Sequence, residues 1–405
     1  MSREFDLIIF GASGFTGQIA VKYLDENYPS LKWAISGRNY KKLKKVSENT
    51  KKMPEVFVAD SNDQESLAEI VKKTNVIASL AGPFSKYSNN LVEQCFNHGT
   101  HYVDITGENL WVRDLIDKYH DKAEKKGVFI IPSCGYDSIP SDIGAYFSYK
   151  SLNQPILSID GYHTANGGIS GGTTETGFTM NDYKTRYKIG NPFLLNSDDV
   201  VSENQKNSSK DSFSISKVKE IDKWSAPFIM AIANTRVVRR SASLLEKRQQ
   251  SYGSNFVYNE YMMTKKLSSA LLITIGLAIL STIMFTPLRK IFRPLFPAPG
   301  TGPSEEVQNN GWFESIFIVQ NENKEKFKFR VFGEGDPGYK STARFICESA
   351  LSICLDKEKI DKNINGGVLT TASGLGDVLI DRLKKSGVLF EGPEKIFEQT
   401  KLKTH

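Results

Sequence analysis

The chain has 405 residues, which is too long for one ordinary domain and suits two or three. Hydrophobic residues make up 40% and charged residues 24% of the chain, close to the globular average, so cores of ordinary size can form. The net charge of +6 is mild and spread along the chain, and we expect no nucleic-acid partner.

The first 131 residues alternate short apolar runs with amphipathic stretches, which predicts an α/β Rossmann domain over residues 1–145. Six strands separated by helices indicate a doubly wound parallel sheet with right-handed crossovers. The expected strands are Leu7–Phe10, Trp33–Ser36, Val56–Ala59, Val76–Leu80, His101–Val103 and Val128–Ile131. The expected helices include Gly17–Glu26, Gln64–Lys72, Asn89–Asn97 and Leu110–Lys125.

The regular alternation ends after Pro140, and we expect a second, mixed α/β substrate domain over residues 146–365. A strand is expected near Leu157–His163, and alternating strand patterns return at Glu314–Gln320 and Lys326–Phe332. Helices are expected over Tyr339–Leu355 and Leu375–Lys385. Residues 366–405 are expected to form a helix and strand segment that packs back on the core.

Cysteine and histidine usage indicates a reduced protein without a structural metal. The four cysteines are widely scattered without CxxC spacing, and the five histidines form no metal-ligand pattern. The N-terminus runs straight into a strand, so we expect neither a signal peptide nor a transit peptide.

A glycine-rich loop lies directly between the first strand and the first helix. In a GxxGxxG loop the first glycine permits a tight turn, the second lets a pyrophosphate approach the backbone, and the third lets the helix pack on the sheet. Backbone N–H groups at the helix N-terminus then face the phosphates. The predicted cofactor-binding residues here are Gly11, Ser13, Gly14, Phe15, Thr16 and Gly17.

The end of the second strand indicates which dinucleotide binds. An NAD-binding domain usually has an acidic residue there to hold the ribose 2′-hydroxyl, whereas this chain has Ser36-Gly37-Arg38-Asn39. Arg38 offers a forked cation for a 2′-phosphate, so we predict NADP, with NAD as the alternative. An ordinary surface arginine is the alternative for Arg38. Asp60, after the third strand, is predicted to approach the adenine edge, with a helix-capping role as its alternative.

Three later loops are expected at the same carboxyl edge of the sheet, where open α/β sheets bind ligands. Ala81, Gly82 and Pro83 follow the fourth strand and are predicted to line the cofactor. The segment Asp104–Glu108 follows the fifth strand, and Glu108 is either a site residue or a helix cap. Tyr136 and Asp137 follow the sixth strand and are the predicted catalytic residues, with Tyr136 as the proton donor and with nicotinamide packing and helix capping as their alternatives.

The run Lys41-Lys42-Leu43-Lys44-Lys45 is the one local concentration of positive charge. Such a run typically forms a solvated helix face, and a phosphate or lipid-headgroup contact is its alternative.

Taken together, these segments resemble the saccharopine dehydrogenase-like oxidoreductase family. The resemblance implies a NAD(P)-dependent oxidoreductase, similar also to the mycobacterial trans-acting enoyl reductases of glycolipid synthesis and to animal proteins linked to lipid droplets. It extends over nearly the whole chain. Its motifs are GASGFTGQ, AISGR, AGPF, YVDITGE and CGYDSIPSD, then Ser225–Phe228, Val237–Arg240, Gly335–Tyr339, Gly366–Val368 and Ile380–Leu383.

An uncharged segment of 22 residues, Leu267–Leu288, interrupts the second domain. It is long enough to span a bilayer, but a single crossing would separate strands that should share one sheet. We therefore favour a monotopic membrane anchor, with a buried core or dimer helix and a true span as alternatives.

These patterns predict an oxidoreductase that uses NADP and acts on a lipid-like or glycolipid-type substrate at the cytosolic face of a membrane or lipid droplet. The alternatives are a membrane-associated binding or scaffold protein without turnover and a soluble saccharopine-type amino-acid dehydrogenase. A homodimer is left open.

Overall fold

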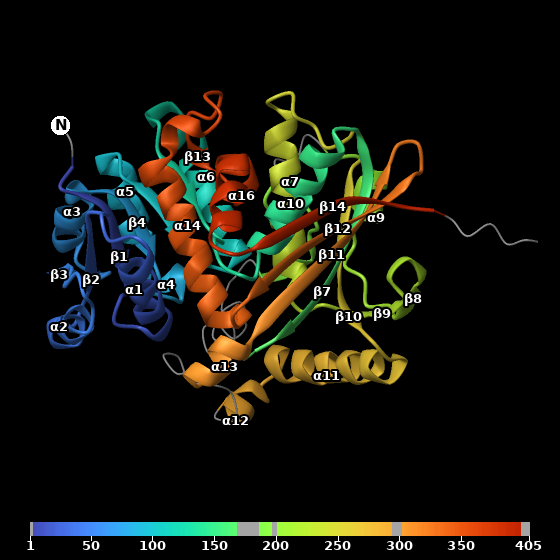
Figure 1. Cartoon of the computed structure of the whole chain (residues 1–405), viewed down its shortest axis with the longest axis horizontal. Coiled ribbons are helices and arrows are strands. Elements are labelled where there is room, and N and C mark those ends of the chain that lie inside the picture. Colours follow the sequence, from blue (N-terminus) through green and yellow to red (C-terminus); the bar gives the residue numbers. More distant parts are fainter. Residues whose placement is uncertain (1–2, 168–185, 197–200, 294–301, 398–405) are drawn as a thin grey trace, which may run out of the picture.

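The structure is a computed structural model that describes residues 3–167, 186–196, 201–293 and 302–397 (Figure 1). It contains two seven-stranded sheets, one parallel and one mixed, with helices around and between them.

The first sheet is parallel in every pair and has the order β13-β6-β5-β4-β1-β2-β3. The six predicted strands are confirmed, and a seventh comes from the C-terminal part of the chain. The strands are β1 (Phe5–Phe10), β2 (Trp33–Gly37), β3 (Glu55–Val58), β4 (Thr74–Ser79), β5 (His101–Asp104), β6 (Phe129–Ile131) and β13 (Gly367–Val368).

Helices cover both faces of this sheet, which explains why its strands read as continuous apolar runs. Leu7, Ile8 and Ile9 of β1 are all fully buried although they alternate between the two faces. The helices are α1 (Phe15–Asn27), α2 (Tyr40–Glu48), α3 (Gln64–Lys73), α4 (Phe84–Tyr87), α5 (Asn89–His98) and α6 (Asn109–Lys126).

The second sheet has the order β14-β12-β11-β7-β10-β9-β8 and is mixed, since β7 and β10 are parallel and the other pairs are antiparallel. In β12 buried and half-buried residues alternate, as expected for a sheet with one face on a core. The strands are β7 (Ile156–Asn166), β8 (Ser216–Val218), β9 (Lys223–Ala226), β10 (Val257–Thr264), β11 (Trp312–Asn321), β12 (Lys326–Glu334) and β14 (Leu389–Ile396).

Two long helices that the sequence patterns did not reveal, α7 (Ile139–Leu152) and α10 (Ala231–Glu246), pack against the inner face of the second sheet. The helix α7 is buried on most sides and shows no polar stripe, whereas α10 buries Arg236, Arg239 and Arg240, so charged residues lie on its packed faces. The helix α14 (Thr342–Leu355) packs instead on α1, β4 and β5 of the first sheet.

The last third of the chain therefore contributes to both sheets. The expected boundary after residue 145 falls inside α7, and residues 366–397 place β13 in the first sheet and β14 in the second. The remaining elements are η1 (Arg186–Gly190), α9 (Glu203–Ser208), η3 (Lys219–Ile221), α12 (Arg289–Phe292), α13 (Glu305–Asn310), η5 (Pro337–Ser341), η6 (Lys357–Lys359), α15 (Thr371–Gly374) and α16 (Gly376–Lys385).

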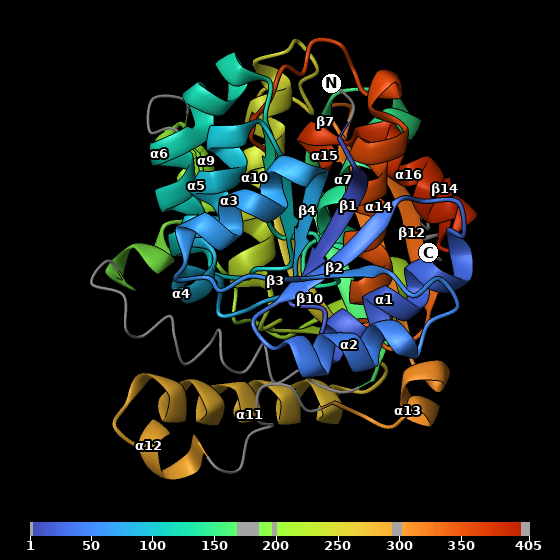
Figure 2. The ribbon, with the colours of Figure 1, turned by 90° about the vertical axis from the view of Figure 1, so that its left-hand side faces the viewer.

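The apolar segment forms the helix α11 (Leu267–Phe285), which lies along one side of the molecule beyond both sheets (Figures 1 and 2). Only 6% of the residues in its most apolar window, Leu267–Met284, are buried. It is therefore not a core helix of this chain. The strand before it, β10, and the strand after it, β11, belong to the same sheet.

Candidate functional site

The glycine-rich loop turns sharply between β1 and α1. Gly11 has a positive φ of 84°, and its N–H donates to the carbonyl oxygen of Ser36 at 2.9 Å. The N-cap of α1 is Gly14, which is exposed and has an extended backbone. Having no side chain, Gly14 leaves the first N–H groups of α1 open toward the loop.

The three glycines are required by their surroundings, and each for a different reason. A Cβ on Gly11 would lie 3.0 Å from the backbone nitrogen of Ala81, and one on Gly17 would lie 2.4 Å from the carbonyl oxygen of Gly11. A Cβ on Gly14 would meet only that same oxygen, at 3.2 Å, and would otherwise point into open space. Gly14 thus keeps a space free at a helix N-terminus, which fits the pyrophosphate of a dinucleotide.

Arg38 and Asp60, which are also predicted to bind the dinucleotide, lie at the same edge of the sheet as this loop. Arg38 directly follows β2 and is exposed, and it forms no ion pair with any residue that the structure describes. A 2′-phosphate on the adenosine ribose is the group that such a forked cation binds best. Asp60 follows β3, and its carboxylate accepts from the backbone N–H of Asn62 at 2.9 Å, which closes a turn. The adenine contact predicted for Asp60 stays a prediction.

The loop after β4 is held in place by a buried glutamate. Glu108 is fully buried and accepts from the backbone N–H of Phe84 at 2.7 Å and of Ser85 at 3.4 Å. This bond caps the short helix α4, so the capping alternative for Glu108 describes what the residue does. Ala81, Gly82 and Pro83 directly precede the residues that Glu108 holds, and they lie beside the glycine-rich loop, since a Cβ on Gly11 would lie 3.0 Å from the backbone nitrogen of Ala81.

Tyr136 and Asp137 lie in the loop between β6 and α7, where the two sheets meet. Both are partly exposed, and the Tyr136 ring packs edge-on against Phe313 of β11 at 5.3 Å between centroids. Burial, and next the charge of Asp137, raise the pKa of the Tyr136 hydroxyl, so it keeps its proton at neutral pH. Burial raises the pKa of Asp137 to about 6.

Next to Tyr136 the second sheet carries a buried polar cluster that sequence reasoning missed. Glu260 of β10 accepts from the Tyr258 hydroxyl at 2.7 Å and from the Asn234 side-chain amide at 3.0 Å. His163 of β7 lies with its Nε2 3.7 Å from Glu260 Oε1, and its Nδ1 is 2.8 Å from the Ser315 hydroxyl. His163 and Glu260 are each 3% exposed.

Burial favours the uncharged forms of Glu260 and His163. It raises the pKa of Glu260 to about 7, against the lowering effect of hydrogen bonds from Ser141, Tyr258 and Asn234. It lowers the pKa of His163 to about 3. The charge of Glu260 contributes to the raised pKa of Tyr136, so the protonation of the cluster is coupled to the predicted proton donor.

The chain that follows α11 packs directly on the glycine-rich loop. The Phe15 ring lies so close to Gly302 that a Cβ there would come within 2.2 Å of it, and the same ring packs edge-on against Tyr339 at 4.7 Å. Lys22 of α1 pairs with Glu305 of α13 at 2.9 Å. The apolar helix is therefore attached next to the proposed dinucleotide site.

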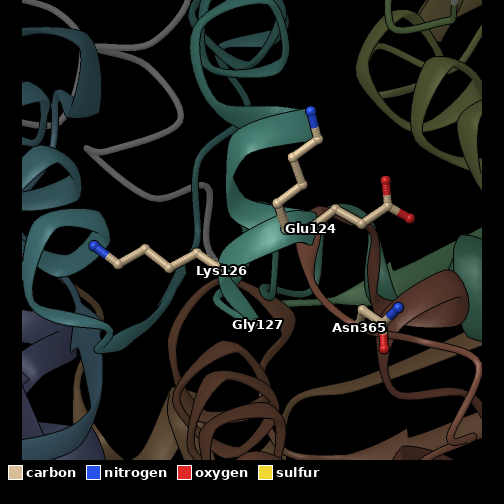
Figure 3. Close-up of a pocket in the computed structure, with 5 residues that line it drawn as sticks. Glu124, Lys126, Gly127 and Asn365 are labelled. Atoms are coloured by element: carbon tan, nitrogen blue, oxygen red, sulfur yellow. The ribbon is translucent and has the colours of Figure 1, made fainter.

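Two other polar features lie away from this site. His120, Asp121 and Glu124 on α6 could by distance hold a metal ion, but His120 Nδ1 already accepts from the backbone N–H of Val368 at 3.2 Å. A surface hollow lies where α6 ends, and Figure 3 shows the long side chains of Glu124 and Lys126 pointing out of it in different directions. This hollow is at the amino end of β6, opposite the edge that carries the loops described above.

Comparisons with known proteins agree with this geometry. The model of the saccharopine dehydrogenase NADP binding domain matches residues 7–131. A protein of Mycobacterium tuberculosis that is provisionally named a trans-acting enoyl reductase is 30% identical, with 95% of this chain and 97% of that protein aligned. The chain belongs to the saccharopine dehydrogenase-like oxidoreductase family. A trans-acting enoyl reductase of Mycobacterium bovis is 29% identical, over 96% of this chain and 97% of its own length.

The whole fold also has a solved counterpart. Saccharopine dehydrogenase (L-Glu forming) from Saccharomyces cerevisiae superposes with a TM-score of 0.53 at 11% identity, covering 96% of this chain and all of the other. At that identity the likeness concerns the fold. With the family shown, the protein is a NAD(P)-dependent oxidoreductase whose first domain binds NADP.

Proposed function

We propose that the protein is an NADPH-dependent reductase of an enoyl group on a lipid or lipid-linked chain, working at the cytosolic face of a membrane or lipid droplet. The observation that carries the proposal is the position of α11. This exposed apolar helix lies on the side of the molecule where the parallel strands of the first sheet end (Figures 1 and 2). The helix α13 lies on the same side.

The exposure of α11 is costly in water. Leu272 is 70% exposed, and Ile275 and Ile279 are each 56% exposed. Each Å² of apolar surface left in water costs about 25 cal/mol, so a helix with apolar side chains on every face favours a non-aqueous environment. A membrane interface or a droplet monolayer provides one.

The flanks of α11 support contact with a single leaflet. Lys265 and Lys266 precede the helix and are exposed, and Arg289 and Arg293 follow it. Cations at both ends suit a helix that lies in the headgroup region and remains on one side. Because β10 and β11 share a sheet, both ends of the helix return to the same folded body.

The chemistry follows from the loops at the carboxyl edge. NADPH, when bound, supplies the hydride that adds to the β-carbon of the enoyl group. The glycine-rich loop would hold the pyrophosphate and Arg38 the 2′-phosphate. Tyr136 would donate a hydrogen bond from its protonated hydroxyl to the acyl oxygen, and a proton added at the α-carbon completes the reduction.

The relatives named trans-acting enoyl reductases support an enoyl substrate, and α11 supports a lipid-bound one. NADPH oxidation should therefore be followed with a long-chain 2-enoyl thioester in phosphatidylcholine vesicles, with a short, water-soluble enoyl thioester as the comparison substrate. Saccharopine, which has no double bond for a hydride to reduce, is tested in the opposite direction, by the reduction of NADP⁺. We expect turnover of the vesicle-borne thioester. Turnover of saccharopine alone would overturn the proposal.

A polar version of α11 tests the role of the membrane. Leu271, Leu272, Ile275 and Ile279 are all more than two-fifths exposed, and glutamine has nearly the helix propensity of leucine. Changing the four to Gln should release the protein from vesicles and lower turnover of the vesicle-borne thioester, while NADPH affinity is kept. Leu355→Gln with Leu389→Gln, at two exposed positions elsewhere, is a control for the loss of exposed leucine side chains and should do neither.

A further inference from the structure

We propose that the lysine-rich face of α2 is a second membrane contact and that it recognises anionic lipid headgroups. This inference rests on the proposed function, because it assumes that α11 brings the protein to a lipid surface. It adds the class of lipid and the orientation of the dinucleotide-binding domain on it.

The arrangement of the helices is the first argument. Figures 1 and 2, which are related by a turn about the vertical axis, both place α2 along the lower side of the molecule. The helices α11, α12 and α13 lie along that same side in both views. A surface that accepts α11 would therefore also face α2.

The charge on α2 is the second argument. Leu43 and Ser47 are buried against the sheet, and Lys41 and Lys45, one turn apart, lie on the opposite face of the helix and are exposed. With Lys42 and Lys44 the nine-residue helix has four lysines and a single acidic residue, Glu48.

These lysines are largely free to meet a ligand. Lys44 lies 3.8 Å from Glu48, whereas Lys41, Lys42 and Lys45 form no ion pair within the described ranges. Other surface helices of the first sheet balance their charges: Lys22 of α1, for example, is paired with Glu305. On α2, by contrast, most of the lysines have no acidic partner in the described part of the chain.

The lysines of α2 lie at different distances along the chain from Arg38. The helix begins at Tyr40, so Lys41 lies in its first turn, three residues after Arg38, whereas Lys45 lies five residues beyond Tyr40, about 7.5 Å along the helix axis. A cation near an anionic leaflet strengthens binding by about fivefold, and the effect fades beyond a Debye length, about 10 Å at 0.1 M salt. The α2 lysines would lie within that range only if the lower side of the molecule faces the membrane.

The experiment is vesicle co-sedimentation of the full chain on phosphatidylcholine alone and on phosphatidylcholine mixed with phosphatidylserine. We expect the wild type to prefer the mixed vesicles, and Lys41→Gln with Lys45→Gln to lose about tenfold or more of its affinity for these vesicles only. Added salt should reduce the wild-type preference in the same way. NADPH affinity should stay unchanged.

The matched control is Lys122→Gln with Lys125→Gln, which removes the same charge from exposed positions on α6, near the amino end of β6. An equal loss in this control would overturn the inference, because it would show an effect of net charge. A wild type without preference for phosphatidylserine would also overturn it, as would a fall in the NADPH affinity of the α2 variant matching its fall in vesicle binding.

Failure of the proposed function gives a different result. A wild type that binds neither kind of vesicle would contradict the membrane role of α11 and this inference together. Binding to both kinds with equal affinity, lost on making α11 polar, would leave the proposed function in place and contradict the role of α2 alone.

Discussion

Adding one methyl group to Gly14 or to Gly17 should have opposite consequences, although the two residues are one helical turn apart in the same loop. A Cβ on Gly17 would lie 2.4 Å from the carbonyl oxygen of Gly11 and 2.8 Å from the Cα of Ala12. Both neighbours are backbone atoms at the junction of β1 and α1, so the strand and helix must separate. A Cβ on Gly14 would meet one oxygen at 3.2 Å.

The magnitudes follow from these contacts. Overpacking of this kind typically costs about 1–3 kcal/mol. Gly17→Ala should lower the free energy of unfolding by this amount or more, because the atoms that its methyl group displaces belong to the rigid backbone. Gly14 has φ −72° and ψ 165°, which alanine also adopts, so Gly14→Ala should change stability by less than about 1 kcal/mol. Its methyl group would fill the space kept for the pyrophosphate, and NADPH affinity should fall about tenfold or more, which is about 1.4 kcal/mol.

Urea unfolding measures the first effect and NADPH fluorescence titration the second. The expected pattern is a stable variant that does not bind NADPH well, Gly14→Ala, beside a destabilised variant, Gly17→Ala. If Gly14→Ala bound NADPH as tightly as the wild type, the pyrophosphate would not lie on this loop. If Gly17→Ala were as stable as the wild type, the close approach of α1 to β1 would be wrong.

Three further substitutions test other parts of the site. Arg38→Ala should weaken NADPH binding by roughly 1.5–3 kcal/mol, tenfold or more, with NADH affinity unchanged; equal affinities of the wild type for both dinucleotides would refute the role of Arg38. Tyr136→Phe should lower kcat for enoyl reduction by about a hundredfold with the Kd for NADPH unchanged, and an unaffected kcat would remove Tyr136 as the donor. Glu260 has a pKa of about 7 in the fold against an ordinary 4.5, so the folded state holds a proton that the unfolded chain has released and loses stability as pH rises through that window. Glu260→Gln should remove this loss of stability, which is of the order of 3 kcal/mol between the two pKa values, and urea unfolding at a series of pH values measures it. If the free energy of unfolding of the variant depended on pH as that of the wild type does, Glu260 would be ionised in the folded protein.

Most of the first sheet could be predicted from the sequence because the patterns that indicate its strands are local in the chain. Each strand is a short apolar run bounded by helices, and the glycine-rich loop lies between the first strand and the first helix in the order that a dinucleotide site requires. The seventh strand, β13, could not be found this way. It has only two residues and joins the sheet from the far end of the chain beside Phe129 and Ile130.

The second sheet and its polar cluster were harder for a physical reason. The helix α7 lies between the sheets and is buried on most sides, so its sequence has no helical stripe of polar residues. Glu260 and His163 meet only because β10 and β7 pair in parallel. One signal was available: Glu260 alternates with Tyr258 in the pattern of a strand, so an acidic residue falls on its buried face.

The second sheet also limits the ways in which α11 can contact a membrane. The strands β10 and β11 flank the helix along the chain, and both pair with β7, so the residues before and after α11 share one hydrogen-bonded sheet. No sheet can keep these pairs with its strands on opposite sides of a bilayer, because the hydrocarbon layer would lie between them. We therefore predict that protease sites inserted after residue 255 and after residue 305 are both cleaved on the outside of intact microsomes. Protection of one site alone would show that α11 crosses the bilayer, and the pairing of β7 with both strands would then be wrong.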